Sequence, residues 1–153
     1  MDVDLWVMRF AGDRARTVAA AIIAGAPGCA ASFSDSGAMS VLAVSASGSV
    51  GADVEQVKER PAVDRIAQRV LSPAERRAIA EAPVPERLVR FYRAWTAAEA
   101  SAKARGEGLP ALLGERSRPA LPTTWVEPAP GYVAAVASGE GAPRVRVREL
   151  HRA

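Results

Sequence analysis

The chain has the length of one domain, since 153 residues can bury about two-thirds of the surface that they expose when unfolded. Its residues are 49% hydrophobic and 24% charged, a composition that excludes a disordered or membrane-embedded protein. The formal net charge of +3 suits an acidic partner. It gives no case for binding nucleic acid, because no basic cluster lies beside stacking aromatic residues.

Cysteine and histidine, two residue types that many catalytic and metal sites use, occur only once each in the chain. Cys29 is the only cysteine, so no intramolecular disulfide and no cysteine-rich metal site is expected. His151 is the only histidine, which makes histidine-dependent catalysis unexpected. The longest run of small apolar residues, 18–26, is too short to span a bilayer. No basic segment precedes a long apolar run at the N-terminus, so we expect no signal peptide and a cytoplasmic protein.

The first half of the chain alternates strand patterns with turn residues. It predicts, in order, a strand over 3–10, a helix over 13–24 that Gly25 and Pro27 end, a short strand over 29–33, a turn at 34–37 and a buried strand over 38–45. A short turn at 46–49 then leads into a strand that carries Asp53 and Glu55. Strands joined by so short a connection usually form a hairpin, so we expect these two strands to be antiparallel neighbours.

The second half is predicted to be helical first and then to end in strands. A helix reaches about residue 70, and Ser72, Pro73 and Glu75 form a capping box for a helix that ends near residue 82. A long helix follows over about 86–105 and ends at Gly106, where a left-handed cap is expected. Its apolar stripe, which should pack on the sheet, consists of Leu88, Phe91, Tyr92 and Trp95. The closing strands are predicted over 123–126, 132–137 and 145–150. These elements predict an α+β fold: an antiparallel sheet with helices mostly on one face.

Three carboxylates are the strongest candidates for a functional site. Asp53 and Glu55 are two residues apart on a strand, so their side chains leave on the same side. Two adjacent carboxylates repel each other, and a hard divalent cation is the usual relief. Glu99 on the long helix is the candidate for a third ligand. The alternative for the strand pair is a solvated face beside basic residues.

The long helix places Trp95, Glu99 and Lys103 on one face, because they are spaced four residues apart. The simplest interpretation of Glu99 and Lys103 is an i,i+4 ion pair. Trp95 is expected to be a core anchor rather than a stacking platform for a ligand.

These motifs together resemble those of the 4′-phosphopantetheinyl transferases, particularly the Sfp-type members. The resemblance rests on the strand Gly51-Ala52-Asp53-Val54-Glu55, on the helix from Trp95-Thr96 through Glu99-Ala100 to Lys103, and on the following Gly106-Glu107-Gly108-Leu109. Two connecting segments, 69–75 and 91–95, are similar to the family's as well. The resemblance extends from about Ala31 to about Val136.

The resemblance implies a role for each site residue. It implies that Asp53, Glu55 and Glu99 bind Mg²⁺ and that Glu99 is also the general base on a carrier protein's serine. It implies that Lys103 contacts the diphosphate of coenzyme A, the co-substrate. Ser34, Asp35 and Ser36 stand where the family has a Ser-His-Ser loop that binds coenzyme A, and this implies a cofactor-binding role for the segment.

Three departures from the family pattern affect the coenzyme. Asp35 stands in place of a histidine that contacts a phosphate, and Ala98 in place of a lysine. Within a single domain over 1–153, the first half, 1–47, is shorter than in Sfp-type chains, whereas 48–153 carries the acidic triad. The smaller AcpS-type members are trimers, so self-association into a homo-oligomer is predicted here.

The leading hypothesis is therefore Mg²⁺-dependent transfer of phosphopantetheine from coenzyme A to a serine of an acyl or peptidyl carrier protein. The alternative is a family member without this activity, which binds a carrier protein or acts on a carrier-bound thioester. A structural interaction module without a ligand is a third hypothesis, which the intact acidic triad disfavours.

Overall fold

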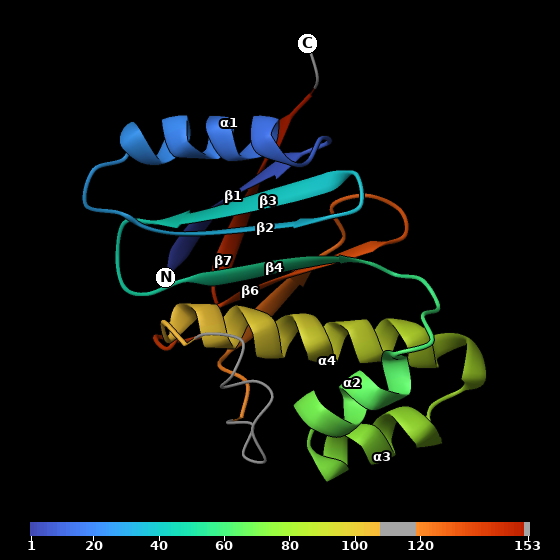
Figure 1. Ribbon diagram of the computed structural model, residues 1–153. Coiled ribbons are helices and arrows are strands. Elements are labelled where there is room, and N and C mark those ends of the chain that lie inside the picture. The colour runs from blue at the N-terminus through green and yellow to red at the C-terminus, as the bar shows by residue number, and fades with distance from the viewer. Residues whose placement is uncertain (108–118, 152–153) are drawn as a thin grey trace.

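The computed structural model describes residues 1–107 and 119–151 (Figure 1). Gly108 and Leu109, part of the motif that follows the long helix, lie outside these residues. Among the described residues, no helix is both long enough and apolar enough to cross a membrane. The elements, in chain order, are β1 (Asp2–Met8), α1 (Asp13–Ala24), β2 (Ala30–Ser36), β3 (Met39–Ser45), β4 (Gly51–Gln56), α2 (Val63–Val70), α3 (Pro73–Glu81), α4 (Val84–Ala104), β5 (Thr123–Val126), β6 (Tyr132–Ala137) and β7 (Arg144–Leu150).

The strands form two sheets. The first has the order β2-β3-β1-β7 and the second the order β4-β6-β5. Neighbouring strands are antiparallel, except that β7 runs parallel to β1. The predicted α+β class with largely antiparallel strands is confirmed, and the strands are divided between two sheets rather than gathered in one.

The two sheets pack against each other and carry helices on their outer faces (Figure 1). Ala15 and Ala19 of α1 pack on Met8 and Leu42 of the first sheet. The helix α4 covers the outer face of the second sheet, and α2 and α3 lie beyond it, as Figure 1 shows. The core between the sheets joins Val3, Leu5, Val7, Met39, Val41 and Ala43 to Val50, Ala52, Val54, Ala134 and Val136.

The helix α4 ends at a local sequence signal and packs on its neighbours through its apolar stripe. Its C-terminus has Gly106 at φ 69°, with Glu107 N–H donating to the Ala102 carbonyl at 2.8 Å, which confirms the predicted left-handed cap. The apolar stripe packs on Val133 of β6 and on Val70 and Leu71 at the end of α2. The α3 capping box is confirmed as well, with both of its hydrogen bonds formed between Ser72 and Glu75.

Two predictions for the first half are wrong. The strands β3 and β4 belong to different sheets, so they do not form a hairpin, and β4 pairs with β6 instead. The predicted turn at residues 34–37 is strand through Ser36, and the chain reverses at Gly37, where φ is 57°. The prediction relied on the frequency of serine in turns, whereas the alternate serines of β2 lie in a strand and hydrogen-bond β4.

Candidate functional site

The acidic residues of β4 lie on the side of the strand that faces α4. Ala52 and Val54 point into the core between the sheets, so the alternate residues Gly51, Asp53 and Glu55 point the other way. A Cβ atom on Gly51 would overlap the Ala100 carbonyl oxygen of α4. This close approach of strand and helix brings the face with Glu99 and Lys103 next to Asp53 and Glu55.

Alternate serines of β2 connect that strand to β4. The hydroxyls of Ser32, Ser34 and Ser36 accept hydrogen bonds from the β4 backbone amides of Ala52, Val54 and Gln56 at 2.9, 3.3 and 3.2 Å. Two of them also donate to the carboxylates. Ser34 Oγ donates to Asp53 Oδ1 at 2.9 Å, and Ser36 Oγ donates to Glu55 Oε2 at 3.1 Å. These three serines, here called the serine ladder, therefore hold both the strand and its acidic side chains.

Asp35 lies on the other face of β2. Because it sits between Ser34 and Ser36 in a strand, its side chain points toward α1. It forms an ion pair with Arg16 of that helix at 3.7 Å. Of the three β2 residues predicted to bind the coenzyme, Ser34 and Ser36 thus contact the acidic side chains directly, whereas Asp35 is turned away from them.

Lys103 contacts Asp53. The i,i+4 ion pair with Glu99, which was the simplest interpretation of the sequence, is not the contact that Lys103 makes. Lys103 Nζ lies 3.1 Å from Asp53 Oδ1 and donates to the carbonyl oxygens of Ala52 and Phe33 at 3.0 and 3.5 Å. Its ammonium is therefore placed at the junction of β2 and β4, which the spacing along α4 alone could not indicate.

Each of the other two acids has a partner of its own. Trp95 Nε1–H donates to Glu99 Oε1 at 3.0 Å, and Trp95 also packs in the apolar cluster around Phe91 and Tyr92, as expected of a core anchor. Glu55 Oε2 accepts from Arg60 at 3.3 Å. Arg60 was not predicted as a site residue, because the only signal for it in the sequence is its position five residues beyond Glu55.

Burial makes ionisation of the two β4 carboxyl groups energetically unfavourable. Asp53 is 4% exposed, and desolvation raises its pKa from 3.8 to about 7. The nearby Glu99 and Glu55 raise this pKa further, and Lys103 offsets part of the increase. Desolvation also raises the pKa of Glu55 above its ordinary value. Asp53 Oδ2 is buried and has no hydrogen-bond partner among the described residues.

The donor chemistry of these residues fits a hard cation. A buried carboxylate oxygen without a partner, close to two further carboxylates, is the kind of ligand that Mg²⁺ takes. In the described part of the chain, however, no group of three or more His, Cys, Asp or Glu side chains is arranged to hold a metal ion. The carboxylates instead contact Lys103, the serine ladder, Arg60 and Trp95.

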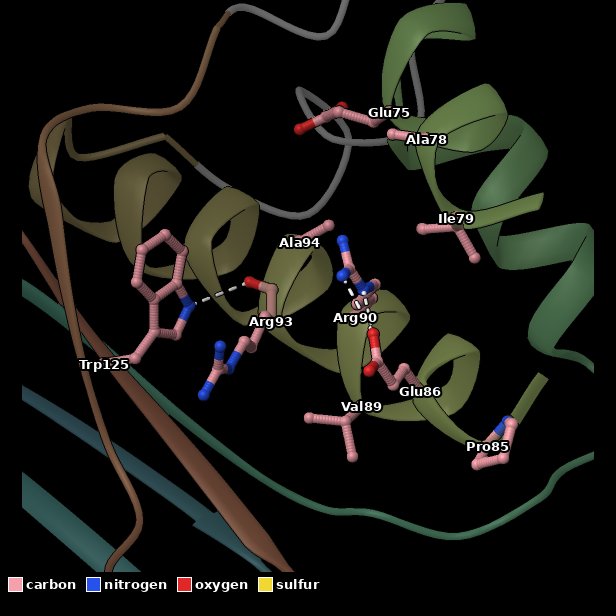
Figure 2. A pocket seen from close by; sticks show the side chains of 10 residues that line it. All are labelled: Glu75, Ala78, Ile79, Pro85, Glu86, Val89, Arg90, Arg93, Ala94 and Trp125. Atoms are coloured by element: carbon pink, nitrogen blue, oxygen red, sulfur yellow. Dashed lines mark hydrogen bonds and ion pairs between the residues drawn. The ribbon is translucent and has the colours of Figure 1, made fainter. Parts of the chain in front are cut away.

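A separate cavity of about 590 Å³ lies between α3, the first half of α4 and β5 (Figure 2). Its lining combines apolar side chains such as Ile79 and Val89 with Arg90 and Arg93, and it includes none of the three acids. Figure 2 shows Trp125 at one end of it, with its indole N–H donating to the Arg93 carbonyl at 3.0 Å. The cavity is not part of the acidic site.

Comparison with known proteins identifies one family. The family model described as the 4′-phosphopantetheinyl transferase superfamily matches residues 49–129, more than half of the chain. The matched segment contains β4 and α4, and hence Asp53, Glu55, Glu99 and Lys103. No curated protein matches the chain.

Proposed function

Because the chain belongs to the 4′-phosphopantetheinyl transferase superfamily, we propose that it transfers phosphopantetheine from coenzyme A to a serine of an acyl or peptidyl carrier protein. The observation that supports this proposal is that β4 turns Asp53 and Glu55 toward the face of α4 that carries Glu99 and Lys103. Resemblance to the Sfp-type members extends the proposal to the particular role of each residue.

In this proposal Asp53, Glu55 and Glu99 would hold Mg²⁺. The bound ion would neutralise the negative charge of the coenzyme A diphosphate and of the departing 3′,5′-ADP. The unpartnered Asp53 Oδ2 supports the assignment, since a buried carboxylate oxygen without a donor is an open ligand position.

Glu99 is the proposed general base. The carrier serine hydroxyl forms a bond to the phosphorus that bears the pantetheine arm, the bond from this phosphorus to 3′,5′-ADP breaks, and the serine proton passes to Glu99. Trp95 Nε1–H holds Glu99 Oε1 at 3.0 Å, which orients the carboxylate and leaves Oε2 for the proton.

The test is direct. The protein is mixed with coenzyme A, Mg²⁺ and an apo carrier protein, and the molecular mass of the carrier is measured by mass spectrometry. We expect the carrier to gain one phosphopantetheine group, and the Glu99→Gln variant to lose this activity. A carrier of unchanged mass in the presence of folded protein would contradict the transferase assignment.

A second function is favoured by Asp35 and Ala98, which replace two phosphate-contacting residues of the family pattern. The protein would then bind a carrier protein, or act on a carrier-bound thioester, without transferring phosphopantetheine. Carrier binding without any gain of mass in the experiment above would favour this function.

The remaining assignments follow from the resemblance. We propose one catalytic domain over 1–153, in which 48–153 supplies the acids and 1–47 supports them through β2. We also propose a cytoplasmic location, where coenzyme A and carrier proteins are found together. Self-association stays a prediction, and light scattering at micromolar concentration tests it.

A further inference from the structure

The Lys103 ammonium occupies a place built from oxygen ligands. Its three acceptors are Asp53 Oδ1 at 3.1 Å and the carbonyl oxygens of Ala52 and Phe33 at 3.0 and 3.5 Å. One carboxylate oxygen and two backbone carbonyls are also the donors that a hard divalent cation would take. The other carboxylate oxygen of Asp53 is buried and has no partner among the described residues.

Lys103 therefore supplies the positive charge nearest to Asp53. Arg60 compensates Glu55 at 3.3 Å, and Glu99 receives a neutral donor from Trp95. A divalent cation that bound Asp53 would meet the ammonium within a few ångströms, in surroundings where solvent screens little of the repulsion. The two positive charges cannot share this place at low cost.

The Lys103 ammonium can move away from Asp53 into solvent. Lys103 lies in the last turn of α4, its side chain is 32% exposed, and four methylene groups separate the ammonium from the backbone. Rotation of this stem moves the charge into solvent while the helix stays in place. No backbone rearrangement is needed.

We propose that Lys103 is an internal counter-cation of the acidic site, which a divalent cation must displace from Asp53 in order to bind. The inference rests on the proposed function, because it takes Asp53 as a metal ligand. It adds a mechanism of regulation, because Lys103 occupies the position next to Asp53 until a divalent cation displaces it. The displaced ammonium is then available to bind a phosphate group. Metal and anion binding then strengthen each other, since each favours the displaced position of Lys103.

Titration of the protein with Mn²⁺ alone, followed by calorimetry, tests the inference without any catalytic readout. Lys103→Gln keeps a hydrogen-bond donor for the carbonyl oxygens and removes the charge, and Lys103→Met removes both. The matched control is Lys58→Gln, which changes the only other lysine of the chain. We expect both Lys103 variants to bind Mn²⁺ at least about tenfold more tightly than the unaltered protein, because a like charge near the metal is removed. Lys58→Gln should bind as the unaltered protein does.

The outcomes separate this inference from the proposed function. Mn²⁺ binding of equal strength with and without Lys103 would overturn the displacement and leave the acidic site standing. Mn²⁺ binding to none of the variants would overturn both. If Lys103→Met does not fold because Asp53 has lost its partner, Lys103→Gln alone decides the question, and circular dichroism confirms its fold.

Discussion

At the scale of single residues, Asp53 combines burial with a polar environment that only partly compensates its charge. Ser34 and Lys103 both contact Oδ1, whereas Oδ2 has no partner among the described residues. A buried polar oxygen without a hydrogen-bond partner costs stability, and a bound ion or water or a catalytic role are among the reasons for which folded proteins keep one. This residue is therefore the most informative position for experiments on the site.

Stability is predicted to fall as the pH rises through the range set by Asp53. The fold raises the pKa of this carboxyl from 3.8 to about 7 by desolvation, so the folded state keeps a proton that the unfolded state has lost. The contribution is fully present below pH 3.8 and is lost as the pH rises to about 7. The full effect is on the order of 4 kcal/mol, at 1.36 kcal/mol for each pKa unit.

Asp53→Asn is the matched variant, because it keeps the shape and cannot ionise. Its melting temperature should fall less between pH 5 and pH 8 than that of the unaltered protein. Parallel curves for the two proteins would mean that Asp53 is ionised throughout this range.

Asp35 and Ala98 should weaken the binding of coenzyme A. A charge-assisted hydrogen bond to phosphate contributes about 1.5–3 kcal/mol, or roughly ten- to a hundredfold in affinity. Asp35 supplies a carboxylate instead, although its ion pair with Arg16 at 3.7 Å neutralises part of that charge. We expect the double variant Asp35→His with Ala98→Lys to bind coenzyme A more tightly in calorimetry. Micromolar affinity in the unaltered protein would show that other residues hold the phosphates.

At the scale of elements, the serine ladder joins β2 to β4 through side-chain hydrogen bonds, in the place where two strands of one sheet would form backbone hydrogen bonds. The amides of β4 on this edge are satisfied by serine hydroxyls of β2, so the two strands lie side by side without belonging to one sheet. Each hydroxyl satisfies one backbone donor. In addition, Ser34 and Ser36 hold a carboxylate each.

The ladder predicts different effects for two similar substitutions. Ser32→Ala and Ser34→Ala should each cost about 1–3 kcal/mol in urea denaturation, because a backbone amide loses its acceptor. Only Ser34→Ala should also reduce the rise in melting temperature that Mg²⁺ produces, since Ser32 contacts no carboxylate in the ladder. Ser49→Ala, at an exposed position, is the control and should change neither. An equal loss of the Mg²⁺ effect in both ladder variants would contradict a positioning role for Ser34.

The contact between β4 and α4 depends on a glycine. A side chain on Gly51 would overlap the backbone of Ala100 and would lie 2.6 Å from the amide nitrogen of Ala104. Gly51→Ala should therefore push the helix from the strand and destabilise the protein by about 3 kcal/mol. Gly139→Ala is the control, because open space surrounds that position. Equal thermal stability of the two variants would contradict the close packing.

The local elements could be predicted from the sequence, whereas the pairing of distant elements could not. The helix over 13–24 and the strands over 123–126 and 132–137 have their predicted bounds, because caps, turns and periodicity are local signals. The hairpin prediction failed because β4 pairs with a strand that comes some 75 residues later in the chain, and a short connection does not reveal such a partner. For the same reason the sequence could suggest Asp53 and Lys103 as candidates, but it could not predict the contact between them.

At the scale of the whole molecule, a carrier protein would meet a surface that combines positive charge with an apolar cavity. Arg90 and Arg93 line the cavity, and the same two helices, α3 and α4, also carry Arg76, Arg77 and Arg87. Glu86 compensates Arg90 at 2.9 Å, whereas Arg93 borders the cavity beside Trp125 without an ion pair to any described residue (Figure 2). Carrier proteins are acidic, so charge attraction should orient the partner on this surface.

Binding of a carrier protein should therefore weaken steeply as salt is added, because charges at an exposed interface are screened within about 10 Å at 0.1 M ionic strength. Arg93→Glu should weaken binding by about tenfold at low salt, and by less at high salt, where the apolar cavity supplies the remaining contact. The control is Arg9→Glu, which makes the same change of charge at the end of β1, beside the first sheet. Fluorescence anisotropy with a labelled carrier at several salt concentrations measures both effects. Affinity that does not depend on salt, or that both variants reduce equally, would place the carrier on another surface.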